Sequence, residues 1–167
     1  MSADSYQNDQ NLEVAWAFKA YEHAEIHYSI ITSVDATFLH LSEHDDEIYK
    51  TFRESFPEFD VNIIHVEDLK SDSSKKKWRT FCNKFDGFQN FNYGSLLRLD
   101  PMLDYSDENT TFATRIQFLA IEIARNREGL TRKLYQKTLQ TRKTNIFNVD
   151  DKGVEKVTDS AKDIPVS

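Results

Sequence analysis

The scarcity of helix-breaking residues is the feature that most limits how this chain can fold. Its 167 residues include only 4 glycines and 3 prolines. These two residue types mark most tight turns, so few turns are indicated by the sequence. Long helices suit such a chain better than a sandwich of many strands. We therefore expect a mainly α protein, a compact helical fold with at most a short two-stranded element.

Length and aromatic content favour one domain, since domains commonly contain roughly 100–150 residues. The 12 Phe, 7 Tyr and 2 Trp residues can fill a hydrophobic core. The first nine residues are polar, and the chain after about Thr144 is charged and lacks apolar periodicity. We expect a flexible N-terminus over 1–9, a single helical domain over 10–143 and a disordered C-terminal tail over 144–167.

Apolar residues spaced three and four apart predict the helices. A first helix covers 11–32, where Phe18 and Tyr21 are expected to widen a buried face. A second begins after a cap at Ser42 and stops before Pro57. A third, short helix is closed by Gly87. The expected buried stripe of the first helix is Trp16, Ala20, Ala24 and Ile31. That of the third helix is Trp78, Phe81, Cys82 and Phe85.

Three segments leave strand and helix open. Residues 61–66 are β-branched and indicate a short strand or an extended connector. Residues 91–100 fit either a strand or a helical turn. Residues 112–128 alternate like a strand at first but repeat like a helix overall, and we favour a helix that ends at Gly129. Its expected cap is Asn109, Thr110 or Thr111.

Charge and cysteine content limit the classes of partner. The net charge of −7 argues against non-specific binding of DNA or anionic membranes. No apolar run approaches the ~20 residues of a membrane span, and the first residues lack the apolar centre of a signal peptide. Cys82 is the single cysteine, so an intrachain disulfide is impossible. These features predict a cytoplasmic protein.

Few residue patterns indicate chemistry. His23 and His27 lie four apart on a predicted helix and can share a metal ion, but Glu25 is not in the zincin position and no third ligand is evident. The adjacent carboxylates of 45–47 point in three directions, which suits a helix start better than a cation site. Cys82 on the inward stripe is expected to be unreactive. We expect no catalytic residues, no cofactor and no metal, and hence no enzyme.

The charges are unevenly distributed along the chain. Residues 43–60 are strongly acidic, whereas 125–143 are strongly basic. A dipolar surface of this kind can orient a charged partner.

Four stretches resemble the polysaccharide biosynthesis domain-containing protein family. They are Asp45-Asp46-Glu47-Ile48-Tyr49, Lys77-Trp78-Arg79 with Phe81 and Phe85, residues 91–100 (Phe-Asn-Tyr-Gly-Ser-Leu-Leu-Arg-Leu-Asp) and residues 115–129 (Arg-Ile-Gln-Phe-Leu-Ala-Ile-Glu-Ile-Ala-Arg-Asn-Arg-Glu-Gly). The likeness covers about residues 9–135 in the same order, and the last stretch is long and therefore specific.

The resemblance implies a small helical cytosolic domain and a role in protein folding. A fungal relative is understood to act as a dedicated chaperone for newly made translation elongation factor 1A, and the family has no catalytic residues to transfer. The implied partner is a protein client, nascent elongation factor 1A, with a possible ribosome contact. For the polar rim of a client-binding surface we expect Asp45, Asp46, Tyr49, Arg98, Arg115, Arg125, Asn126 and Arg127.

Three other interpretations remain open. In the first, individual rim residues serve instead as helix caps or internal ion pairs, and Arg115 with Glu122 is the first such pair to expect. The basic segment 125–143 would suit an RNA- or ribosome-binding module. A sugar-modifying enzyme would suit the family's name, although no paired carboxylates or phosphate loop support it.

Overall fold

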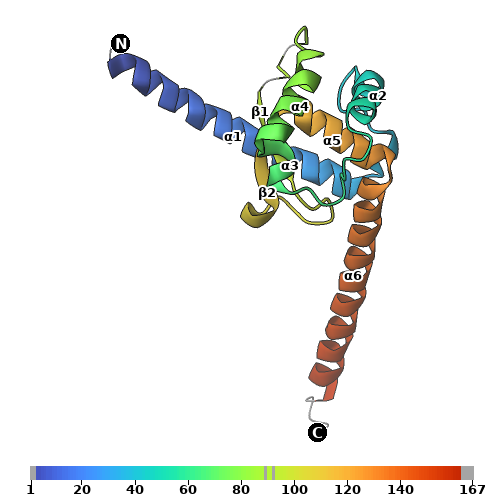
Figure 1. Cartoon of the computed structure of the whole chain (residues 1–167). Coiled ribbons are helices and arrows are strands. Elements are labelled where there is room, and N and C mark those ends of the chain that lie inside the picture. The colour runs from blue at the N-terminus through green and yellow to red at the C-terminus, as the bar shows by residue number, and fades with distance from the viewer. Residues whose placement is uncertain (1–2, 89, 92, 163–167) are drawn as a thin grey trace.

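The structure is a computed structural model that describes residues 3–88, 90, 91 and 93–162. Within these residues it contains six α-helices, two short 3-10 turns and a two-stranded antiparallel sheet (Figure 1). The expected mainly α fold with a short two-stranded element is thus confirmed. The elements are α1 (Ala3–Ser33), η1 (Ala36–Phe38), α2 (Asp45–Ser55), α3 (Val66–Lys70), α4 (Asp72–Asn83), β1 (Gly94–Arg98), η2 (Asp107–Asn109), β2 (Thr110–Thr114), α5 (Arg115–Arg127) and α6 (Leu130–Lys162).

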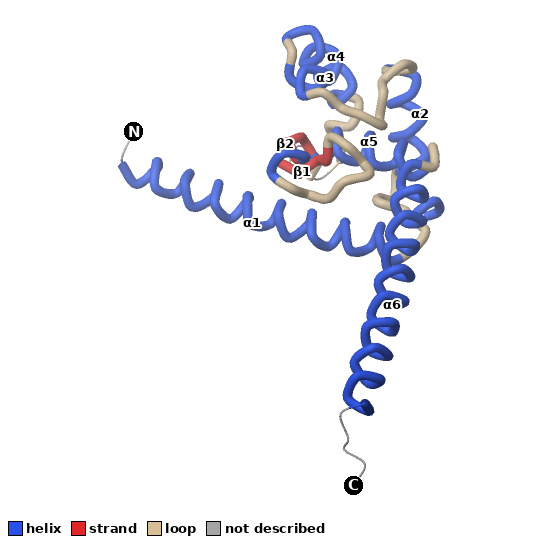
Figure 2. Tube along the Cα trace, turned by 90° about the horizontal axis from the view of Figure 1, so that it is seen from below, coloured by secondary structure: helices blue, strands red, loops and turns tan. Residues whose placement is uncertain are grey.

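Two long helices, α1 and α6, extend from a compact body in different directions (Figures 1 and 2). The hairpin of β1 and β2 lies over the middle of α1, while the first half of α1 projects beyond the body. Helix is present from Ala3 and as far as Lys162, so both segments expected to be flexible are helical where the structure describes them. Their flexibility in solution, and the domain limits 1–9, 10–143 and 144–167, stay predictions.

Helix α5 is the centre of the fold, because every residue from Ile116 to Asn126 is buried. It packs against α2, α4, α6 and both strands. A helix enclosed on all sides has no polar stripe. The sequence of 112–128 therefore showed no clear period.

The ends of this segment explain its mixed signals. Residues 110–114 form β2, and only from Arg115 does the chain turn helical. Thr114 caps α5, accepting a hydrogen bond from the Gln117 backbone N–H at 3.3 Å, and the Gln117 side chain accepts one from the Thr114 N–H at 3.0 Å. The expected cap at 109–111 was wrong, because Thr110 and Thr111 belong to the strand and Asn109 to the preceding turn. The expected end at Gly129 is confirmed by its φ of 88°.

An aromatic core joins α2 to α4. Trp78, Phe81 and Phe85 are buried as expected, and the Trp78 ring stacks on Phe56 with centroids 4.4 Å apart. The Trp78 indole donates to the Asp68 carbonyl at 3.1 Å, which satisfies its polar atom. Cys82 is only partly buried, contrary to expectation, because it lies at the edge of this stripe. Partial burial still raises the pKa of its thiol.

Two connectors precede helices of the core. Residues 61–65 form a connector and no strand, which is one of the two alternatives that the sequence left open, but α3 already begins at Val66. The Ile64 backbone N–H donates to the Leu99 carbonyl at 3.0 Å. Ser42 does not cap α2, whose cap position is His44. The buried Asp45 carboxylate instead accepts bonds from the Leu41 and Ser42 backbone N–H groups, at 2.8 and 2.7 Å. It thereby fixes the entry to the helix.

Helix α1 buries a narrower face than its sequence suggested. Ala20, Ala24 and Ile31 are buried as expected. Phe18 and Tyr21, however, are 71% and 56% exposed, so they do not widen that face. The body therefore covers the side of α1 that carries Ala20 and Ala24 and leaves the side of Phe18 and Tyr21 in water.

Candidate functional site

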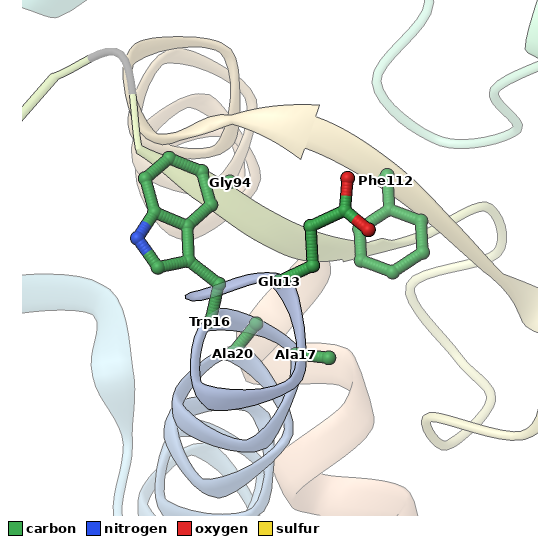
Figure 3. Close-up of a pocket in the computed structure, with 6 residues that line it drawn as sticks. All are labelled: Glu13, Trp16, Ala17, Ala20, Gly94 and Phe112. Carbon is green, nitrogen blue, oxygen red and sulfur yellow. The ribbon is translucent and has the colours of Figure 1, made fainter. Parts of the chain in front are cut away.

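An apolar groove of about 440 Å³ lies where α1 passes the hairpin. Figure 3 shows the residues that line it, with the Trp16 and Phe112 rings on either side of small residues. Trp16 is 46% exposed and Phe112 59% exposed. The lining residues are Glu13, Trp16, Ala17, Ala20, Gly94 and Phe112.

Alternation in β2 directs Phe112 outward. Its neighbours Thr111 and Ala113 are buried, and Phe112 pairs with Leu96 of β1. Small side chains on the facing elements keep the space between the rings open. A Cβ added at Gly94 would lie 3.6 Å from the Trp16 ring, so even alanine would come into contact with it.

A second hollow of about 170 Å³ continues the groove past Trp16 and is basic. Lys19 and Arg115 line it together with Tyr93, whose ring meets Trp16 edge-on with centroids 5.1 Å apart. The Arg115 Nε donates to the Ser95 hydroxyl at 3.0 Å, which holds the guanidinium at the wall. The groove therefore has an apolar part and a cationic part that share Trp16.

A buried ion cluster lies behind this surface. The Glu122 carboxylate is fully buried and accepts from Arg125 at 2.9 Å and from Arg98 at 3.4 Å. Burial alone would raise the pKa of Glu122, but the two guanidinium groups lower it to about 2. The carboxylate is thus ionised at neutral pH.

The two arginines also fasten surrounding loops to α5. Arg125 donates to the Val61 carbonyl at 2.7 Å, and Arg98 donates to the Pro101 carbonyl at 2.9 Å. These carbonyl groups and the Glu122 carboxylate act as partners for the two buried guanidinium groups, which matters because an unpaired buried charge is costly. The cluster organises the interior and offers no access to a substrate.

His23 and His27 of α1 pack against the same interior. His27 is buried and its Nδ1 lies 2.9 Å from the Tyr105 hydroxyl. Burial lowers its pKa to about 4, so the ring is neutral at pH 7. The rings of His23 and His27 are nearly parallel with centroids 6.4 Å apart, and both pack edge-on against Phe118. Within the described ranges, no three His, Cys, Asp or Glu side chains are placed to share a metal ion.

The eight residues expected at a polar rim separate into three places. Four of them are buried and cannot contribute to an exposed rim in this structure. Asp46, Tyr49 and Arg127 do come together on the surface, where Arg127 pairs with Asp46 and lies 5.2 Å from the Tyr49 ring. Arg115 lies apart from them, at the groove. The buried four are Asp45, Arg98, Arg125 and Asn126.

The expected ion pair of Arg115 with Glu122 was wrong. Arg115 contacts Ser95, whereas Glu122 pairs with Arg98 and Arg125. Arg115 begins α5 beside β1, and Glu122 lies two turns further along the buried helix. A charged residue in a helix usually faces water, which is why the sequence indicated a surface.

Sequence reasoning missed the groove because it placed Trp16 on the buried stripe of the first helix. One signal was present: Trp16 and Phe18 lie nearly on opposite sides of a helix with 3.6 residues per turn. They cannot both lie on one narrow buried stripe, so at least one of them is exposed in a helix that buries a single face. Phe112 could not be found in this way, since its exposure depends on the register of β2.

The basic segment 125–143 is partly neutralised. Arg125 is buried with Glu122, Arg127 pairs with Asp46, and the Arg132 Nε lies 3.4 Å from Asp35. Exposed cations that continue along α6 are Lys133, Lys137, Arg142 and Lys143. None of the helices in the described part of the chain combines the length and apolar character that a bilayer crossing requires.

Comparison with known proteins gives consistent matches. A family model described as "PBDC1 protein" matches residues 12–136. Protein PBDC1 of Homo sapiens is 53% identical over 136 residues, covering 81% of this chain and 58% of the human protein. Protein PBDC1 of Mus musculus is 56% identical over 127 residues, covering 75% of this chain and 64% of the mouse protein. The chain thus spans about three fifths of the length of these two mammalian relatives.

A yeast relative agrees in sequence and in structure. The Protein PBDC1 homolog of Saccharomyces cerevisiae is 40% identical over 134 residues, covering 77% of this chain and 92% of the yeast protein. A solution NMR structure of protein yst0336 from the same organism is 38% identical, with a TM-score of 0.72 over 81% of this chain and 97% of that one. The matches in sequence and fold confirm the resemblance inferred from the motifs: this chain belongs to the PBDC1 family.

Proposed function

We propose that this protein is a non-enzymatic chaperone that binds newly synthesised translation elongation factor 1A in the cytoplasm. The observation that carries the proposal is the exposed apolar groove between α1 and β2. Trp16 and Phe112 leave about half of their side-chain surface in water there, although burying such rings is favourable. A surface that keeps aromatic side chains exposed is typical of a site that another protein covers.

Further exposed apolar side chains lie on another side of α1, outside the groove. Val14, Phe18 and Tyr21 follow at spacings of four and three and are 69%, 71% and 56% exposed. They therefore lie on one side of the helix. A holder of an incompletely folded client needs an apolar surface of this kind with charges at its border, and needs no reacting groups. The identity of the client rests on the family resemblance.

Co-purification from a translating extract tests the proposal. Tagged protein should retain elongation factor 1A while the factor is being synthesised, and Ala17→Trp should abolish retention by filling the groove. Gln140→Trp is the matched control, because it adds the same side chain at an exposed position of α6. The proposal fails if the wild-type protein retains no elongation factor 1A. It also fails if both tryptophan variants behave alike.

One observation favours a second candidate function, binding of RNA or the ribosome. Lys133, Lys137, Arg142 and Lys143 are exposed along α6. If these cations contact phosphates, affinity for RNA should fall steeply with salt, and Lys133→Glu with Lys137→Glu should weaken it uniformly across sequences. Binding that is insensitive to salt would exclude this candidate.

A further inference from the structure

The groove is chemically asymmetric along its length. The apolar part lies between Phe112 and Trp16, with Glu13 at its border. Beyond Trp16 the lining changes to Lys19, Tyr93 and Arg115. A bound segment would therefore meet an acidic group and an apolar surface first, and cationic groups about one turn of α1 later.

The two cations are available for a partner. In the part of the chain that the structure describes, no carboxylate lies within ion-pair distance of Lys19 or Arg115, whereas the exposed Arg127 and Arg132 pair with Asp46 and Asp35. Arg115 is held at the wall by its bond to Ser95, so its position is set before a partner arrives. Charge complementarity then selects a carboxylate for this end of the groove.

We infer that the groove binds a protein segment in which an apolar side chain is followed closely by an aspartate or glutamate. The apolar side chain enters between Trp16 and Phe112, and the carboxylate pairs with Lys19 and Arg115. The inference rests on the proposed function in taking the occupant to be a protein client, and it adds the chemistry that the client segment must present. Glu13 at the opposite border disfavours the reverse placement of the carboxylate.

Selection from a library of random dodecapeptides displayed on phage tests this chemistry without assuming a client. The wild-type protein should enrich peptides that combine leucine or an aromatic residue with a nearby Asp or Glu. The enriched peptide is then synthesised, and its Kd is measured by fluorescence anisotropy. Lys19→Glu should weaken that peptide about five-fold or more, since it replaces an attraction with a repulsion at a partly screened site. Ala17→Trp should abolish binding.

Two controls separate charge from folding. Lys50→Glu makes the same change at an exposed position of α2 and should leave the Kd unchanged. Lys19 is itself exposed, so Lys19→Glu should retain the circular dichroism and melting temperature of the wild type. A second selection against Lys19→Glu should no longer favour acidic peptides.

The inference is overturned if no peptide is enriched, if enriched peptides lack an acidic bias, or if Lys19→Glu and Lys50→Glu have equal effects. These outcomes are distinct from failure of the proposed function. If acidic peptides bind in the groove but elongation factor 1A does not co-purify, the proposed client is wrong and the inferred chemistry of the groove holds. Co-purification of the factor with no acidic preference would do the reverse.

Discussion

Replacing Glu122 by glutamine should destabilise the protein more than any other single loss of charge. The carboxylate is fully buried and is the shared acceptor of Arg98 and Arg125. Glutamine keeps the size of the side chain but leaves two buried cations without a counter-charge. Removing one partner of a buried ion pair typically costs about 3–5 kcal/mol.

The titration of Glu122 gives an independent magnitude. Its pKa is about 2 in the folded protein, against an ordinary value of 4.5. A difference of this size corresponds to roughly 3 kcal/mol of preferential stabilisation of the ionised form. Because the folded pKa is the lower one, this stability is present above pH 4.5 and is lost as the pH falls from there toward about 2.

Urea and thermal unfolding at pH 7 provide the assay. A loss of about 3 kcal/mol should lower Tm by about 6–12 °C in a domain of this size. Glu128→Gln is the matched control, because Glu128 pairs with Arg53 at 2.6 Å but both side chains are partly exposed. The control should cost less than about 1 kcal/mol. If the free energy of unfolding of Glu122→Gln were within about 1 kcal/mol of the wild-type value, the ion cluster would not be what organises the interior.

The remaining predictions concern the core, the end of α5, acid stability and the tail. Trp78→Ala should cost about 3–5 kcal/mol, measured by urea unfolding, because the ring is buried against Phe56; an unchanged midpoint would contradict this packing. Gly129→Ala should destabilise by about 1 kcal/mol or more, since alanine is strained at a φ of 88°; equal Tm values would count against it. Folded His27 has a pKa near 4 instead of 6.5, so it contributes stability above pH 6.5 that is lost as the pH falls toward 4; His27→Gln should flatten that part of the stability profile. Deleting residues 144–167 should leave Tm within a degree or two, because α6 is already exposed from residue 140 to 148; a larger fall would show that the tail docks on the body.

Local signals made much of the fold predictable. The three-and-four spacing located the body of α1 and the core stripe of α4, because each helix has a buried face. The end of α2 before Pro57 was predictable because proline restricts the backbone of the residue before it. Gly129 marked the end of α5 for the same local reason. The strand–helix ambiguity of 112–128 was real, since the segment is a strand for its first residues and a helix afterwards.

The candidate site was much less predictable, because it depends on contacts between distant segments. Arg98 and Glu122 are 24 residues apart and become partners only when β1 packs against α5. The charge of Arg98 suggested a place at an exposed rim, whereas the fold buries Arg98 in an ion pair with Glu122. The groove needs α1 to pass the hairpin at Gly94, and no local pattern in either segment states that they meet.

Helix α1 contributes side chains both to the hydrophobic core and to the groove. Ala24 and Ile31 fix its second half in the body, while Trp16 forms one wall of the groove. At 1.5 Å per residue, Trp16 lies about 22 Å along the axis from Ile31. A tilt of about 5° at the Ile31 end would move that wall by about 2 Å, by the same geometry. Side chains that never touch the occupant therefore influence the width of the groove, and a substitution as small as Ala24→Val should change binding by tilting α1.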